Sequence, residues 1–230
     1  MPSALLLHGF TSHPVLTLGP LPETLRQAGF EVAMPALPGH GTRPEDLKGV
    51  RWQDWYRVGL EAYRSLPEPR AVVGLSMGGL LAAKLAAEED PQALVALVPA
   101  LGFKNPLSPL APYLAWLMPT YKGTNSVRDP ERRKHSPNYP YFPTASFAEL
   151  LKLSRLTSPL LPRVKAPALV LQAGYDSTVP EEAIMRYYNL LGSRQKDRRV
   201  YQESEHDLLL DVQADAVATD IRDWLLQVMR

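Results

Sequence analysis

The chain has 230 residues, enough for one large α/β domain or two small ones, and enough for a substantial buried core. Its 25 lysines and arginines nearly balance its 24 aspartates and glutamates, so no net field favours nucleic acid or an anionic membrane surface. Cysteine is absent, which excludes disulfides, thiolate catalysis and cysteine-bound metal ions.

The N-terminal segment leads directly into an apolar run. Residues 1–7 have no basic start and leave no room for the apolar region of a secretory leader. No apolar run of the chain approaches the length needed to cross a bilayer. We therefore expect a soluble, cytoplasmic protein without integral membrane association.

Short apolar runs alternate with helix-forming segments along most of the chain. Continuous apolar runs are typical of strands buried on both faces of a parallel sheet. Segments rich in Leu, Ala and Glu between them favour helices. The predicted strands are residues 4–7, 30–34, the run that starts at 71, 94–98, 168–172 and 199–201, and the predicted helices are 18–27, 52–66, 80–89, 181–191 and 214–228.

Strands that alternate with helices predict an α/β fold, with a mostly parallel sheet of about six strands and helices on both faces. The alternation stops between residue 101 and about residue 163, where prolines are frequent. We expect no strand there, only short helical pieces such as 110–118 and 147–153. This segment is interpreted as a small helical cap, 101–163, inserted after the fourth strand of a single domain whose core is 1–100 and 164–230.

The third apolar run ends in Gly74-Leu75-Ser76-Met77-Gly78 and passes at once into a run of helix formers. A serine at such a junction is typical of a sharp, strained turn that exposes a nucleophilic hydroxyl. The flanking glycines fit, because side chains around that turn must be small or absent. The pattern also arises by chance, but here it lies in the context that the turn requires. Ser76 is therefore the predicted nucleophile.

A serine hydroxyl needs a base to remove its proton at neutral pH. In this strand–turn–helix architecture the chain order is serine, acid and then histidine, and only His135 and His206 follow Ser76. His135 lies among basic residues of the expected cap, where a solvated turn is the simpler interpretation. His206 follows the last predicted strand, on a loop at the same edge of the sheet as Ser76. We predict that His206 is the base, with a solvent-facing loop histidine as the alternative.

The base in turn needs a carboxylate that orients it and stabilises its charged form. Asp176 follows the strand predicted at 168–172, in the required order. It competes with a simpler interpretation, in which it caps the helix that starts near residue 180. Asp207 and Asp211 are rival acids, although Asp207 is next to the histidine and its side chain should point elsewhere. Asp176 is the predicted acid.

An acyl-transfer site also needs two donors for the oxyanion of the tetrahedral intermediate. The backbone N–H of Met77, directly after the nucleophile, is one candidate. The loop after the first strand should supply the other, and Phe10 is chosen there. His8 and Gly9 are expected to shape that loop, with a chemical role for His8 left open. His40, between two glycines, is expected to be structural.

Several segments together match a known pattern: LLLHGFT at 5–11, GHG at 39–41, WQDW at 52–55, GLSMGG at 74–79, DSTVP at 176–180 and HDLLLD at 206–211. They resemble small bacterial carboxylesterases and monoacylglycerol lipases of the α/β-hydrolase fold. The resemblance spans nearly the whole chain and is weakest in the cap. It implies a serine esterase with Ser76, Asp176 and His206 as the catalytic triad, Phe10 and Met77 as oxyanion donors, and no cofactor or metal.

The chain departs from this family in two places. It begins almost directly at the first buried strand, so the leading edge strands of the full fold are expected to be missing. The sequence Ser204-Glu205-His206 has a glutamate where relatives often carry glycine, which is expected to restrict the histidine loop.

The cap should set the substrate, because it covers the cleft. Apolar cap stretches are more often packing than pocket, yet a cap must present some surface to the cleft. A neutral, small-molecule ester with a short or medium acyl chain fits an apolar surface, and a polyanion does not. The same triad serves acyltransferases, thioesterases and lactonases, and a non-catalytic hydrolase-like binding module is a further alternative. The apolar cap side chains are Leu107, Leu110, Tyr113, Leu114, Trp116, Leu117 and Met118.

Overall fold

A computed structural model describes residues 1–123 and 125–229, with residue 114 described by its backbone alone. Six parallel strands form the centre of the molecule, in the order β2-β1-β3-β4-β7-β8. This arrangement confirms the predicted α/β class and the sheet of about six strands. The strands are β1 (Ser3–Leu7), β2 (Glu31–Ala33), β3 (Arg70–Leu75), β4 (Ala93–Leu97), β7 (Ala168–Ala173) and β8 (Lys196–Tyr201).

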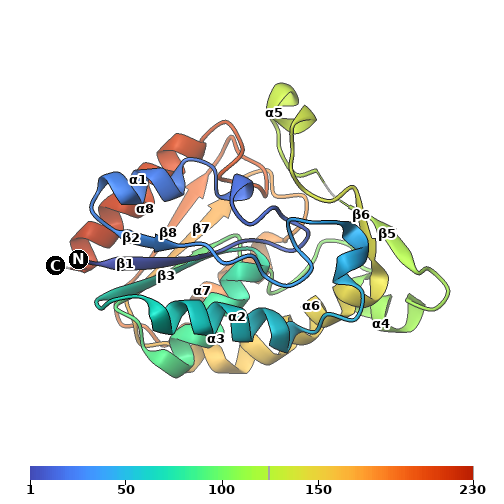
Figure 1. Cartoon of the computed structure of the whole chain (residues 1–230), viewed down its shortest axis with the longest axis horizontal. Coiled ribbons are helices and arrows are strands. Elements are labelled where there is room, and N and C mark those ends of the chain that lie inside the picture. The colour runs from blue at the N-terminus through green and yellow to red at the C-terminus, as the bar shows by residue number, and fades with distance from the viewer. Residues whose placement is uncertain (124, 230) are drawn as a thin grey trace.

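Helices cover both faces of the sheet (Figure 1). The pair α1 and α8 packs together on one face, and α2, α3 and α6 pack together on the other. No helix in the described part of the chain combines the length and the apolar character needed to cross a bilayer. These helices are α1 (Leu21–Gln27), α2 (Trp52–Ser65), α3 (Met77–Glu89), α6 (Thr144–Thr157), α7 (Glu181–Leu190) and α8 (Ala214–Val228).

Burial explains which strands the apolar pattern located best. Every residue of β1, β4 and β7 is buried, as expected for strands with helices on both faces. The edge strand β8 starts at Lys196, three residues before the predicted start at 199. Its first half is missed because Asp197 and Arg198 are exposed and charged, a composition that edge strands tolerate and that discourages pairing with other chains.

The segment 101–163 contains two strands, where none was predicted. β5 (Thr120–Lys122) and β6 (Tyr141–Pro143) pair in antiparallel orientation. The prediction of a segment without strands is therefore wrong. These strands were missed because strands this short show no periodic pattern. The helix predicted at 110–118 is also too long, since α4 covers only Ala111–Leu114. Beyond it Trp116 and Leu117 are exposed, and without packing a further helical turn is not stabilised.

The second half of this segment joins the main body of the protein. Leu150 and Leu153 of α6 belong to the same hydrophobic core as the sheet. In Figure 1, α6 continues the layer of α2 and α3, whereas β5, β6 and the short helix α5 (Pro130–Lys134) lie beyond the α/β layers. The division into a core and a cap at residues 101 and 163 stays a prediction.

Candidate active site

Ser76 lies at the turn between β3 and α3, in a backbone conformation that residues with side chains rarely adopt. Its φ is 55° and its ψ is −108°. A Cβ atom on Gly74 would lie 2.1 Å from the carbonyl oxygen of Gly78, and one on Gly78 would lie 2.1 Å from that of Leu7. Both positions therefore require glycine, because α3 begins so close to β1 and β3. The turn leaves Ser76 where its strand ends.

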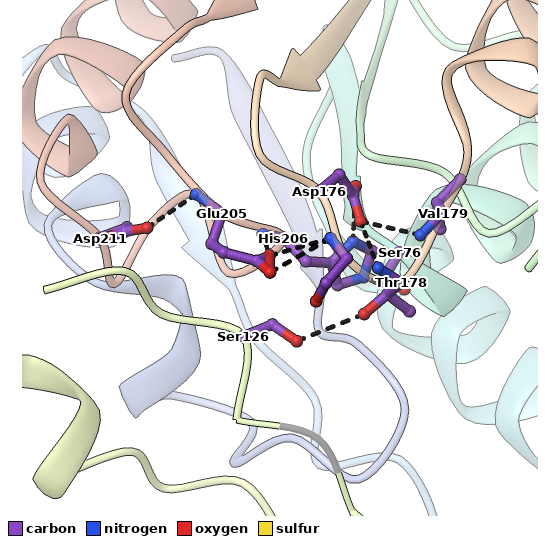
Figure 2. A network of polar contacts seen from close by, with 9 residues as sticks. Ser76, Ser126, Asp176, Thr178, Val179, Glu205, His206 and Asp211 are labelled. Atoms are coloured by element: carbon purple, nitrogen blue, oxygen red, sulfur yellow. Dashed lines mark hydrogen bonds and ion pairs between the residues drawn. The ribbon is translucent and has the colours of Figure 1, made fainter. Parts of the chain in front are cut away.

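His206 and Asp176 lie beside Ser76 (Figure 2). Nε2 of His206 is 2.9 Å from Oγ of Ser76, and Nδ1 of His206 is 2.8 Å from Oδ2 of Asp176. Ser76 follows β3, Asp176 follows β7 and His206 follows β8. All three are buried, with exposed fractions of 8% for Ser76, 5% for Asp176 and 6% for His206. The structure thus brings together the residues predicted as nucleophile, acid and base.

Asp176 contacts the turn before α7 with one carboxylate oxygen and the histidine with the other. Its Oδ1 accepts hydrogen bonds from the N–H groups of Thr178, at 2.9 Å, and Val179, at 2.8 Å. Burial acts to raise the pKa of Asp176, but the neighbouring His206 and these backbone donors outweigh it and hold the pKa below its usual value. Asp176 is therefore an ionised partner for the imidazole at neutral pH, and it also organises the turn.

The environment of His206 favours its charged form. Burial acts to lower the pKa of His206, but Asp176 outweighs it, with further contributions from Asp207 and Glu205, and the pKa is raised above its usual value. Since Nδ1 faces a carboxylate, the hydrogen-bond pattern assigns the proton to Nδ1 and leaves the Nε2 lone pair toward the Ser76 hydroxyl. Such an imidazole can take the hydroxyl proton and stay charged while an acyl group is transferred.

The rival acid Asp207 contacts a residue of the segment 101–163. Asn138 Nδ2 donates a hydrogen bond to its Oδ2 at 2.8 Å, and burial raises the pKa of Asp207 to about 6. The side chain thus points elsewhere, as expected from its place next to the histidine. The alternative base His135 is exposed, at the end of α5.

The other rival acid, Asp211, is fully buried and bonded to the backbone. Its carboxylate holds the histidine loop against the chain that leads into α5, across about 80 positions of sequence. Burial acts to raise the pKa of Asp211, but these donors keep it below the usual value. The donors are the N–H groups of Arg128 (2.9 Å), Asp129 (3.1 Å), Glu205 (2.7 Å) and Val212 (2.9 Å).

The loop after β1 passes directly against the serine. A Cβ atom on Gly9 would lie 3.6 Å from Cβ of Ser76, and Phe10 lines the same cavity as Ser76. Met77 is the first residue of α3, so its N–H has no partner within the helix. The two predicted donors therefore belong to the two backbone stretches that flank the Ser76 side chain.

Two buried histidines lie behind this loop. Nε2 of His8 accepts a hydrogen bond from the Leu37 N–H at 3.2 Å, and Nδ1 lies 2.9 Å from the Gly9 carbonyl oxygen. Burial lowers the pKa of His8 to about 4, and burial together with the neighbouring His8 holds the pKa of His40 well below its usual value. The centres of the two rings are 4.8 Å apart. With both of its nitrogens bonded to backbone, His8 has a structural position, in keeping with the expectation for His8 and His40.

A cavity of about 390 Å³ opens above Ser76 and His206. Within the described part of the chain, no group of three or more His, Asp or Glu side chains is arranged to bind a metal ion. The surface that lines the cavity is mainly apolar. Besides Ser76 and His206, the polar lining residues are Thr11, Ser12, Asn105, Ser108, Lys122, Ser126, Asn138, Thr144, Ser177, Thr178 and Asp207, and the apolar ones include Phe10, Phe103, Leu107, Met118, Phe142, Phe147 and Leu150.

Most of the cap side chains proposed to face the substrate do not line this cavity. Leu107 and Met118 do, but the exposed group Leu110, Tyr113, Trp116 and Leu117 lies outside the lining, and the side chain of Leu114 lies outside the described part of the structure. Their place is taken by Phe103, Phe142 and Phe147. Two of these rings pack near Phe10, whose ring lies 5.2 Å from that of Phe142 and 6.2 Å from that of Phe147. The only sequence feature that pointed to them was their aromatic character.

Further contacts between the segment 101–163 and the loops of His206 and Asp176 were not predicted. The Asp207 N–H donates to the Ser126 carbonyl oxygen at 2.9 Å. The guanidinium of Arg128 lies 3.9 Å above the ring of Tyr175 and donates to Oε2 of Glu203 at 2.7 Å. No local sequence pattern marks these three contacts, since they join positions 81, 75 and 47 residues apart.

The chain matches known proteins over nearly its whole length. Residues 3–213 match the family model described as serine aminopeptidase, S33. A thermostable monoacylglycerol lipase of Bacillus sp. (strain H-257) is 31% identical over 217 residues, covering 90% of this chain and 83% of the relative. A carboxylesterase of Bacillus subtilis (strain 168) is 26% identical, covering 97% and 92%. A structure from work on two metagenome-derived lipolytic enzymes, 26% identical, has a TM-score of 0.91 and covers 98% of this chain and 94% of its own.

Proposed function

The chain belongs to the serine aminopeptidase S33 family of hydrolases, and we propose that it hydrolyses carboxylic esters through an acyl-enzyme on Ser76. The observation that carries the proposal is the chain of contacts from Ser76 Oγ through His206 to Asp176, 2.9 and 2.8 Å long, at the base of a mainly apolar cavity. The names of the relatives, a monoacylglycerol lipase and a carboxylesterase, favour esters as the substrate class.

In the first half of the reaction, Ser76 forms a bond to the acyl carbon. Nε2 of His206 takes the hydroxyl proton as Oγ attacks the ester carbonyl, and Asp176 stabilises the resulting imidazolium. The N–H groups of Phe10 and Met77 donate to the oxyanion. The intermediate then breaks the bond to the alcohol, which leaves with the proton from His206.

In the second half, water releases the acid. His206 takes a proton from a water molecule, whose oxygen attacks the acyl carbon of the ester on Ser76. The same donors stabilise the second oxyanion, and its collapse returns the proton to Oγ of Ser76. The products are one carboxylic acid and one alcohol, and no metal or cofactor takes part in any step.

Hydrolysis of 4-nitrophenyl butyrate tests the proposal directly. The wild type should release 4-nitrophenol in the presence of a chelator, and a serine-directed phosphonate should add once, at Ser76. Ser76→Ala should abolish both reactions. An aminoacyl 4-nitroanilide, the substrate type of an aminopeptidase, should be hydrolysed far more slowly. Wild-type rates in the Ala variant under chelation would show that the mechanism is wrong.

The size of the cavity leads us to propose acyl chains of about four to eight carbons, since each buried methylene contributes about 0.8 kcal/mol until the pocket ends. Phe147→Ala removes a ring from the cavity wall, so the preferred chain should become longer by one or two carbons. Trp116→Ala is the matched control, because Trp116 is 83% exposed. Values of kcat/KM across a series of soluble 4-nitrophenyl esters give the preferred chain length of the wild type and of each variant. A preference that rises steadily to long, insoluble chains in the wild type would contradict the proposed range.

The cap and the location of the protein belong to the same proposal. Residues 101–163 would act as the cap over the carboxyl edge of the sheet, with 1–100 and 164–230 as the core. The cap contributes Leu107, Met118 and Phe142 to the cavity wall, which supports that role. The cytoplasmic location stays a prediction, and fractionation of cells that express the protein would test it.

A further inference from the structure

Glu205, the residue before His206, connects the histidine loop to the loop that carries Asp176 (Figure 2). The Ser177 N–H donates to Oε1 and Oε2 of Glu205 at 3.1 and 3.2 Å. The N–H of His206 itself donates to Oε2 at 2.6 Å. The carboxylate of Glu205 thus accepts hydrogen bonds both from the residue after Asp176 and from His206. A further bond joins the two loops just before these residues: the Tyr175 N–H donates to the Ser204 carbonyl oxygen at 3.0 Å.

Glu205 is itself held in place. Its N–H donates to Oδ2 of the fully buried Asp211 at 2.7 Å, and the same oxygen accepts the Arg128 N–H at 2.9 Å. The backbone on which the Glu205 side chain stands is therefore attached both to its own loop and to the chain that leads into α5. A half-buried carboxylate on such a support has few alternative positions.

We propose that Glu205 is a positioning residue for the acyl-transfer reaction: its carboxylate clamps the histidine loop to the acid loop, and its negative charge stabilises the imidazolium of His206. The catalytic consequence rests on the proposed function. The clamp restricts the movement of Nε2 of His206 relative to Oγ of Ser76, and small displacements of such groups lower rates strongly. The charge acts separately, through the pKa of the base.

Other charged groups also face His206, so their effects on its pKa have to be distinguished from the effect of Glu205. Asp176 and Asp207 are the other two carboxylates that raise its pKa, against the effect of burial. Asp207 is the more serious competitor, because its own pKa is raised to about 6 and falls in the same pH range. The segment 101–163 brings cations toward the site as well: Arg128 is paired with Glu203, Arg132 donates to the Asp211 carbonyl oxygen at 2.8 Å, and Lys122 lines the cavity.

Two substitutions at the same position separate the clamp from the charge. Glu205→Gln keeps an oxygen that accepts hydrogen bonds but removes the charge, so kcat at the pH plateau should stay within about twofold of wild type, while the acid limb of kcat/KM moves down by about half a pH unit. Glu205→Gly removes both, so kcat at the plateau should also fall about tenfold with KM within about twofold. Glu203→Gln, which removes an exposed glutamate two residues away, should change neither. Asp207→Asn reports the separate effect of that carboxylate.

Amide hydrogen exchange provides a readout that does not depend on catalysis. The N–H groups of Ser177 and His206 should exchange slowly in the wild type and in Glu205→Gln, and faster in Glu205→Gly, at a constant melting temperature. If the wild type hydrolyses no ester, the proposed function fails, but exchange still tests the clamp. The inference is overturned if Glu205→Gly matches the wild type in plateau kcat and in exchange. It is also overturned if only Asp207→Asn moves the acid limb.

Discussion

At the scale of single residues, Asp176 differs from the two nearby aspartates in what its oxygens contact. One oxygen accepts two backbone N–H groups and the other lies 2.8 Å from Nδ1 of His206, whereas Asp207 contacts Asn138 and Asp211 contacts backbone donors. The position of one carboxylate oxygen at the imidazole is the geometric basis for choosing the acid.

We therefore expect Asp176→Asn to lower kcat by about 10⁴, the size of the effect of the equivalent change in a serine protease. An amide can donate to Nδ1 and so favours the wrong tautomer of His206. Single-turnover hydrolysis of a 4-nitrophenyl ester measures the loss, and circular dichroism checks that the fold is retained. The kcat of Asp207→Asn should stay within about tenfold of wild type, because this substitution removes a buried charge that does not contact the imidazole. A collapse of the Asp207 or Asp211 variant, with Asp176→Asn within a few-fold of wild type, would mean that another residue is the acid.

His206 also predicts how activity depends on pH. The base must be neutral to accept the serine proton, and its pKa is raised above its usual value, chiefly by Asp176 against the effect of burial. The charged form therefore persists to higher pH than in a free histidine, and kcat/KM should fall as pH drops through a value above about 6.5. Initial rates with a soluble ester between pH 5 and 9 give the midpoint. Full activity at pH 5.5 would exclude His206 as the base in its described surroundings.

At the scale of elements, the junction of β1, β3 and α3 leaves no room at Gly78. Gly78→Ala places a Cβ 2.1 Å from the Leu7 carbonyl oxygen, so α3 must move away from β1. We expect the free energy of unfolding, measured in urea, to fall by about 3 kcal/mol. Activity should also fall, because the chain after Leu7 continues into the loop of Phe10.

Gly59→Ala is the control for this substitution. Gly59 lies inside α2, where its Cβ would meet only the flexible end of the Leu7 side chain, at 3.3 Å. Alanine is the better helix former by about 1 kcal/mol, which offsets the tight contact. The stability of this variant should stay within about 1 kcal/mol of wild type. Equal losses at the two positions would mean that the approach of α3 to β1 is not what requires glycine at 78.

At the scale of the whole molecule, the buried histidine His8 predicts a loss of stability in acid. Its pKa in the folded protein is lowered to about 4 by burial, against about 6.5 in an unfolded chain. Between these values the unfolded state binds a proton that the folded state does not, so stability is fully present above pH 6.5 and falls as pH drops toward 4. The difference of about 2.5 pH units corresponds to about 3 kcal/mol.

Urea unfolding of the wild type and of His8→Asn at pH 7 and pH 4 isolates this contribution. Other titrating groups, such as His206 and Asp207, affect both proteins and cancel in the comparison. The free energy of unfolding of the wild type relative to the variant should therefore fall by about 3 kcal/mol between the two pH values. His135→Gln, at an exposed position, should show no such change. Parallel pH dependence in the wild type and His8→Asn would show that His8 is protonated in the fold.

Local sequence determined the fold class and the strand-to-helix turn that carries Ser76, the predicted nucleophile. The buried strands appear as continuous apolar runs because each is covered on both faces, and the turn at Ser76 requires glycine two residues before and two residues after the serine. These features depend on neighbours within a few positions, so a single sequence displays them. The chain order of serine, acid and histidine favoured Asp176, which precedes His206, over Asp207 and Asp211, which follow it.

Only the tertiary structure shows what each of those aspartates contacts, because loops after different strands bring groups 30 and 130 positions apart to within 3 Å. The same holds for the bonds of Glu205 across 28 positions and for the β5–β6 hairpin, whose strands are too short to show a period. The cavity wall also follows from packing, which places Phe103, Phe142 and Phe147 inward and leaves Trp116 in solvent. A hydrogen bond or an aromatic contact selects its partner by position in space, and apolar periodicity carries no information about that position.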